Sequence, residues 1–183
     1  AGVSAAALHF CQARILYAGK GIPASPASQG PWLICRTGLL EAVGCLAVIA
    51  AAKPNVLSGA DSMASIGGVG ATLSVLGLLA WCSYLEAAMS GGVPPLGRGS
   101  LRRTDLWIRW GGYVLPAGAF IALCVPPITE AGQILLLILG GASAVVCGIA
   151  LKISLVTRAS YQQGYAIPRM PQRGSGNRAA PIR

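Results

Sequence analysis

The sequence predicts an all-α fold, a polytopic transmembrane helical bundle of about five helices, since a spanning helix needs about 20 mainly apolar residues and five stretches reach that length. Composition points the same way. The chain is 54% hydrophobic and only 10% charged, whereas a soluble domain has about 25% charged residues. Most of the charges also lie towards one end of each apolar stretch. A soluble fold of this composition would have too few polar residues to cover its surface.

The five predicted spans are, in order, 1–18, 32–52, 64–89, 105–125 and 131–155. The first is the weakest, because it is short and contains His9, Gln12 and Arg14. It begins at Ala1 without the positively charged region that starts a signal peptide. We therefore expect it to be the end of a helix that starts upstream, and the chain to be the C-terminal part of a larger bundle.

Turn-forming residues separate the spans. Proline and glycine gather at 23–31, 54–59 and 91–95 and in the Pro126-Pro127 pair. The sequence shows no internal repeat. We predict one transmembrane domain, residues 1–156, followed by a basic, Gly/Pro-rich tail, residues 157–183.

The distribution of lysine and arginine predicts the orientation. Alternating spans place the first gap, the third gap and the tail on one face, which carries Lys20, Arg98, Arg102, Arg103, Arg158, Arg169, Arg173, Arg178 and Arg183. The other face carries Lys53, Asp61 and Glu130. The positive-inside rule makes the basic face, with the C-terminal tail, cytoplasmic in a bacterial inner membrane. The net charge of +9 is then a topology signal and predicts no nucleic-acid binding. The simplest role of the Arg98–Arg103 loop is to anchor the chain on anionic lipid.

Ionisable residues inside a span are costly, and function is the default hypothesis for them. Most of them lie in the half of each span nearest the basic face, together with one tyrosine: His9, Arg14, Tyr17, Arg36, Glu41, Glu86, Arg109 and Lys152. They suggest a polar pocket under the cytoplasmic face that binds a polar head group and moves protons, with His9 titrating near neutral pH and Glu41 relaying protons.

Simpler interpretations exist for these residues. Arg14, Arg36, Arg109 and Lys152 could snorkel to the interface, beside an aromatic belt that includes Trp107 and Trp110. Glu41 could form a structural ion pair with Arg36. We favour snorkelling for Arg109 and Lys152, and function for His9 and Glu41, because neither of the latter side chains can snorkel far.

No familiar catalytic or metal-binding motif is present, so we predict no catalytic residues and no metal ligands. The six cysteines are scattered without a C-x-x-C motif, and the single histidine excludes bis-histidine haem ligation by this chain. Electrons could pass only through a diffusible carrier and the cofactor of a partner. The run Gly67-Gly68-Val69-Gly70 fails the G-x-G-x-x-G spacing. Like the Gly140/Ala144/Gly148 row, it is expected to permit close helix packing.

Two segments resemble a known family. The stretch HFCQARILYA at 9–18, continued by GKGIPA at 19–24, resembles the membrane-anchor subunits of dimethyl-sulfoxide-reductase-type molybdopterin oxidoreductases, within the polysulfide-reductase (NrfD-like) superfamily. The end of the chain, Lys152 followed by 158–176, resembles that family's closing motif. In that motif a lysine ends the last helix, and an aromatic residue, a glycine, a proline pair and Arg-Gly follow.

The resemblance implies a subunit that holds an iron–sulfur subunit and a molybdopterin catalytic subunit on the membrane. It implies electron exchange with quinol or quinone as a diffusible substrate, with no haem or metal of its own. The quinone-binding and proton-transfer residues would be His9, Arg14, Tyr17, Arg36, Glu41 and Glu86. His9 and Glu41 would handle protons, and Arg14, Arg36 and Tyr17 would contact the carbonyl oxygens. Partner docking would fall to Tyr165, Pro168, Arg169, Pro171 and Arg173, in a tail whose alternative is disorder.

Two rival functions remain open at this point. A proton-coupled small-molecule transporter also suits glycine-rich helices with a Glu and a His inside the membrane. Against it, no inverted repeat is visible and only Pro116 interrupts a span. The other rival is a purely structural anchor, with the quinone bound elsewhere.

Overall fold

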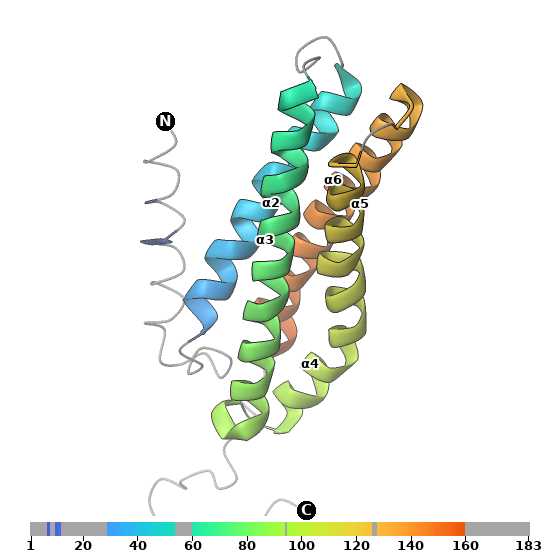
Figure 1. Cartoon of the computed structure of the whole chain (residues 1–183). Helices are drawn as coiled ribbons and strands as arrows, with labels where there is room; N and C mark the ends of the chain where they lie inside the picture. Colours follow the sequence, from blue (N-terminus) through green and yellow to red (C-terminus); the bar gives the residue numbers. More distant parts are fainter. Residues whose placement is uncertain are drawn as a thin grey trace, which may run out of the picture.

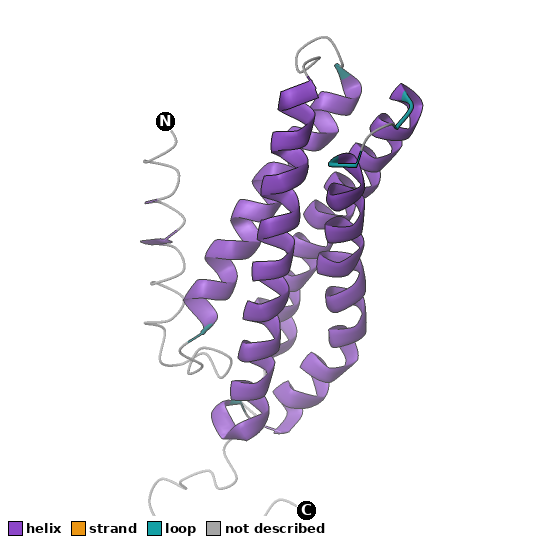
Figure 2. Ribbon diagram, in the orientation of Figure 1, coloured by secondary structure: helices purple, strands orange, loops and turns teal. Residues whose placement is uncertain are grey.

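The computed structural model describes residues 7, 10–11, 29–53, 60–93, 95–125 and 128–159. These residues form helices almost throughout, and this part of the chain contains no strand (Figure 2). The elements after residue 29 are α2 (Gly30–Ala52), α3 (Ala60–Ala87), η2 (Ala88–Gly92), α4 (Pro95–Trp107), η3 (Ile108–Val114), α5 (Leu115–Leu123), α6 (Glu130–Ile153) and η4 (Ser154–Ala159). The predicted all-α fold class is confirmed.

Consecutive elements continue one another, so that α2, α3 with η2, α4 with η3 and α5, and α6 with η4 form four long helical rods. These rods run alternately up and down (Figure 1). In the described residues, four helices are long and apolar enough to cross a membrane: Gly30–Ala52, Ser62–Ser90, Gly97–Leu123 and Glu130–Ile153. The protein is therefore a helical membrane protein, and these helices match the last four predicted spans. The first predicted span, 1–18, lies outside the described residues except for three helical positions, 7, 10 and 11.

One boundary differs clearly from its prediction. The span expected at 105–125 begins ten residues earlier, at Pro95, and runs as α4, η3 and α5 to Leu123. Its first turns carry polar residues. The hydropathy of the sequence therefore indicated the position at which this helix becomes apolar, and not the position at which it begins. The wide π turn η3 ends just before Pro116, which occupies the first turn of α5. Proline is tolerated there because the helix needs no amide donor at that point.

Glycines bring the rods together. The two backbones come closest between α2 and α6: a Cβ built on Gly141 would lie 2.5 Å from the Gly44 carbonyl oxygen. Gly70 leaves room for the Phe120 ring, and Gly77 leaves room for the Tyr113 ring. The close packing predicted for the glycine-rich segments is confirmed, because small residues let helix backbones approach each other. Large apolar side chains cover the outside of the rods, as on a lipid-facing surface: Leu39, Leu46, Ile49, Val69, Leu79, Leu115, Ile121, Val146 and Ile149.

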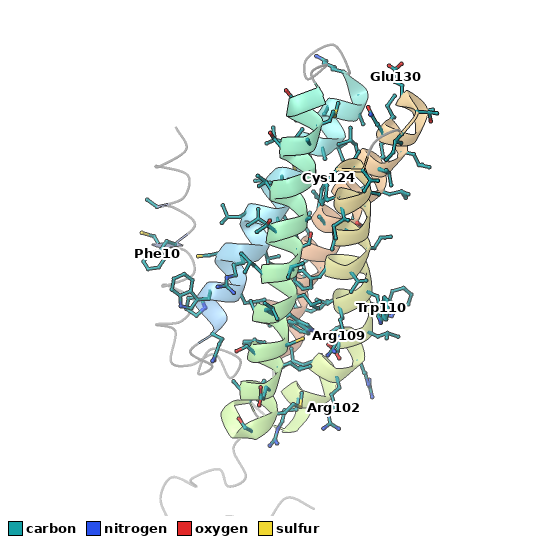
Figure 3. The ribbon with its side chains drawn as sticks, viewed as in Figure 1. Phe10, Arg102, Arg109, Trp110, Cys124 and Glu130 are labelled. Carbon is teal, nitrogen blue, oxygen red and sulfur yellow. The ribbon has the colours of Figure 1, made fainter. Side chains whose placement is uncertain are left out.

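Charged residues mark the two ends of the bundle. Figure 3 shows Glu130 at one end and Arg102 at the other. The end of η2, the start of α4 and the end of α6 share the Arg102 end, whereas the end of α2 and the start of α3 lie at the Glu130 end (Figure 1). This is the alternating arrangement that the sequence predicted. The assignment of the Arg102 end to the cytoplasm stays a prediction.

Candidate functional site

An ion pair joins the middle of α2 to the last turn of α6. Lys152 Nζ donates to Glu41 Oε2 at 2.5 Å, and their side chains are 32% and 17% exposed. Glu41 lies eleven residues above the start of α2, or about 16 Å along the helix. Helical side chains lean towards their own N-terminus. Because α2 and α6 are antiparallel, Lys152 leans up the bundle, Glu41 leans down, and the two charges meet inside it.

A glycine creates the space for this pair. A Cβ at position 148 would overlap the Glu41 carboxyl group, so any larger residue there would displace that side chain from its present position. Gly148 continues the row formed by Gly141 and Ala144, through which α6 packs against α2. The second carboxylate oxygen, Glu41 Oε1, is buried and has no hydrogen-bond partner among the described residues. The glutamate is thus half satisfied: one oxygen holds the lysine, and the other is free to accept a proton or a hydrogen bond.

A pair of hydroxyl groups lies one turn from Glu41. Thr37 Oγ1 donates to the Leu33 carbonyl oxygen at 2.7 Å and lies 3.2 Å from the hydroxyl of Tyr113 in η3. Thr37 has a single hydroxyl hydrogen, which that carbonyl takes, so the Tyr113 hydroxyl is the donor in the second contact. Both residues are buried.

A narrow, closely packed seam between α2, η3 and α6 connects the hydroxyl pair with Gly148. Its lining is mostly apolar and comprises Thr37, Leu40, Ile108, Gly112, Tyr113, Ala144, Cys147, Gly148 and Leu151. The hydroxyl groups of Thr37 and Tyr113 are the polar groups of this lining, and the apolar side chains around them are closely packed. The seam is too closely packed to hold a ligand as it stands, so the chemistry that the described residues offer is acceptance of a proton or a hydrogen bond at Glu41 Oε1.

The structure separates Arg36 and Glu86 from Glu41. Arg36 Nη1 donates to the Leu76 carbonyl oxygen on α3 at 3.3 Å. The proposed structural pair of Arg36 with Glu41 is therefore wrong. Five residues along an α-helix correspond to a rotation of about 140°, which points the two side chains to different faces. Glu86 is exposed on α3, so it does not join Glu41 in a polar pocket.

The other predicted site residues lie outside the described part of the chain. They are His9, Arg14 and Tyr17 of the proposed quinone site, and Tyr165, Pro168, Arg169, Pro171 and Arg173 of the proposed docking segment.

The sequence-based interpretation missed both ion pairs. Lys152 and Arg109 were expected to snorkel as single charges, yet Lys152 holds Glu41 and Arg109 holds Asp105. The Asp105–Arg109 spacing of four residues is a signal that the sequence does contain, because such residues share a helix face. Nothing local could have indicated the partner of Lys152, which is 111 positions away.

The Asp105 carboxylate is fully engaged. Oδ1 accepts from Trp81 Nε1 at 2.7 Å and from Arg109 Nη2 at 3.1 Å, and Oδ2 accepts from the same Nη2 at 3.0 Å. Trp81 is buried and stacks on Tyr84, with ring centroids 6.0 Å apart. This group joins α3 to α4 and η3 near the basic end of the bundle.

The described residues contain no group of three or more His, Cys, Asp or Glu side chains that could hold a metal ion. No protein-family model, curated protein or solved structure matches the chain. The family resemblance consequently rests on the two sequence segments described above.

Proposed function

We propose that this protein is an integral membrane anchor subunit of a molybdopterin/iron–sulfur oxidoreductase in a bacterial inner membrane. It would exchange electrons between membrane quinol or quinone and the iron–sulfur subunit of the complex. The observation that carries the proposal is the Glu41–Lys152 pair with its unsatisfied Oε1, held inside a bundle of membrane-spanning helices. An ionisable pair at such a position is a functional hypothesis by default.

The chemistry of quinol oxidation fits these groups. A quinol gives up two electrons and two protons as it becomes a quinone, so its site needs a proton acceptor and a donor to the developing carbonyl oxygen. Glu41 Oε1 is a buried acceptor, and the Lys152 ammonium beside it can donate to a carbonyl oxygen. The electrons would leave for an iron–sulfur cluster of the partner subunit, and the protons would leave through Glu41.

The Glu41–Lys152 pair, which leaves one buried carboxylate oxygen without a partner in the described residues, is difficult to explain as a stability device alone. Desolvation makes a buried ion pair neutral or unfavourable compared with well-packed apolar residues. A structural anchor could join α2 to α6 through the Gly44–Gly141 contact without any charge. A proton-handling role gives a reason to keep both charges.

The first experiment asks whether partners exist. The full-length subunit is purified from solubilised native membranes, and the proteins that accompany it are identified by mass spectrometry. Iron–sulfur and molybdopterin subunits in fixed proportion support the proposal. A preparation without partners contradicts it and favours the proton-coupled transporter, for which proton-coupled flux in liposomes is the next measurement.

The second experiment tests the site in the assembled complex. Glu41→Gln combined with Lys152→Met leaves no unpaired buried charge, so this double variant is expected to fold and keep its partners. We expect quinol oxidation to fall at least about 100-fold, the lower end of the range by which positioned acid–base groups accelerate reactions. Glu86→Gln, at an exposed glutamate, is the matched control. Unchanged quinol oxidation in the double variant would contradict the site and leave the purely structural anchor.

A further inference from the structure

An arginine pair and an aromatic pair stand one above the other on the outside of α4 and η3. Arg102 and Arg103 are exposed near the middle of α4. Trp107, at the end of α4, is 76% exposed, and Trp110 in η3 is 60% exposed. Figure 3 places Arg102 at the basic end, with Trp110 higher and pointing away from the bundle.

The helix geometry sets the vertical spacing of these groups. Arg103 and Trp107 are four residues apart, so they share a face and differ in height by about 6 Å. Leu106, also exposed, lies between Arg103 and Trp107 in height, and Trp110 is about 4–5 Å beyond Trp107. Along the membrane normal the surface therefore changes from guanidinium to leucine and indole over about two helical turns.

No carboxylate of the described residues forms an ion pair with the arginines of this surface. The nearest carboxylate in sequence, Asp105, is turned inwards and is engaged by Trp81 and Arg109. In the described part of the chain, the ion pairs are Arg109–Asp105 and Lys152–Glu41. Arg102 and Arg103 thus present two positive charges without a carboxylate partner there.

The same surface continues into the apolar outside of the bundle. The rod goes on through Leu115 and Ile121, which are about half exposed. A soluble partner could contact the arginines. The indoles and the leucines, however, lie further along a membrane-spanning helix, where such a partner would not reach them. Indole rings favour the glycerol and carbonyl level of a bilayer, and arginine matches phosphate oxygens with paired donors. Charge and depth together favour a lipid over a protein.

We propose that Arg102, Arg103, Leu106, Trp107 and Trp110 form a binding site for an anionic glycerophospholipid in the leaflet at the basic end. The two guanidinium groups bind the phosphate, Leu106 and Trp107 lie at the glycerol level, and Trp110, about one turn deeper, contacts the first part of an acyl chain. The site is separate from the Glu41–Lys152 pair and does not depend on the proposed function.

The test uses the full chain in phosphatidylcholine nanodiscs with increasing phosphatidylglycerol. Brominated phosphatidylglycerol quenches nearby tryptophan fluorescence, and brominated phosphatidylcholine is the reference lipid. A Trp32→Phe background removes an exposed indole elsewhere, and the remaining Trp81 is buried. We expect preferential quenching by phosphatidylglycerol. Arg102→Gln with Arg103→Gln should weaken that preference about 25-fold, since each basic residue near an anionic surface contributes a factor of about five.

Two control variants define the outcomes. Arg102→Lys with Arg103→Lys retains the charge and should retain most of the preference. Lys53→Gln removes an exposed charge at the opposite end and should change nothing. A lipid preference that survives Arg102→Gln with Arg103→Gln overturns the site. If that variant instead loses a co-purifying protein subunit while its lipid preference is unchanged, the surface is a protein-docking surface.

Discussion

The described part of the bundle contains two acid–base pairs that differ in sequence separation and in how fully the carboxylate is hydrogen-bonded. Asp105 and Arg109 lie one turn apart in the same rod, and a tryptophan completes the hydrogen bonding of the carboxylate. Glu41 and Lys152 come from different helices, 111 positions apart, and one carboxylate oxygen has no partner in the described residues. Both oxygens of the Asp105 carboxylate accept hydrogen bonds, whereas Glu41 Oε1 is buried and accepts none from the described residues. Both pairs are partly exposed, the Glu41–Lys152 pair somewhat less than the other.

The difference separates a structural pair from a functional candidate. A saturated carboxylate such as that of Asp105 can accept little more, and its contacts fasten α3 to α4. An incomplete carboxylate such as that of Glu41 retains an acceptor, in surroundings where an unsatisfied polar group is costly. Desolvation also makes the two pairs respond very differently to the loss of one partner.

The largest expected effect is that of Lys152→Met. This change removes the cation from the Glu41 carboxylate, whose side chain is 17% exposed. The loss of unfolding free energy should therefore lie between the about 1 kcal/mol of an exposed pair and the about 3–5 kcal/mol of a buried one. Unfolding in mixed micelles with increasing sodium dodecyl sulfate, followed by circular dichroism, measures the loss. Adding Glu41→Gln to the same variant should restore most of it, because the stranded charge disappears. A loss below about 1 kcal/mol in the single variant, typical of an exposed pair, would show that the two pairs are equivalent.

Gly141→Ala comes next, because it acts on the helix contact that supports the long-range pair. Its Cβ would lie 2.5 Å from the Gly44 carbonyl oxygen, a backbone atom that cannot rotate away. Overpacking of this kind costs about 1–3 kcal/mol. Gly118→Ala is the matched control, since a Cβ there meets nothing within 4 Å. The same unfolding titration compares the two, and equal stabilities would mean that α2 and α6 are not held as closely as described.

The sequence could predict the spans but not the pairing of their charges. Span positions follow from a strong local signal, the run of apolar residues, and the four described helices match it. The start of α4 at Pro95 was missed because its first turns are polar. An apolar run marks only the part of a helix that can lie in the membrane, and the helix itself can extend beyond that part. The Glu41–Lys152 pair depends on the relative rotation and height of α2 and α6, which Gly44, Gly141 and Gly148 set through tertiary packing. No local pattern encodes that rotation.

At the local pair, Asp105→Ala should cost about 1–3 kcal/mol, because the indole N–H of buried Trp81 loses its acceptor. Asp105→Asn keeps an oxygen for that N–H and should recover most of the loss. Unfolding titrations of both variants, with the fluorescence of the tryptophans as a second readout, measure this. If asparagine fails to rescue, the charge interaction with Arg109 is the larger contribution, and the two pairs are more alike than their geometry indicates.

Arg109→Gln should have the smallest effect. The Arg109 side chain is 40% exposed and pairs with a residue four positions before it, and such pairs contribute about 0.3–0.5 kcal/mol. The Asp105 carboxylate would keep Trp81 as a donor, so no buried group would be stranded. Increasing salt should weaken the contribution of Arg109 further, because exposed charges are screened, while the cost of Lys152→Met should barely change. Measuring the unfolding free energy of both variants over a series of salt concentrations compares how well the two pairs are shielded from water. Equal salt dependence would mean that water reaches Glu41 as readily as Asp105. That result would contradict a special proton-transfer role for Glu41.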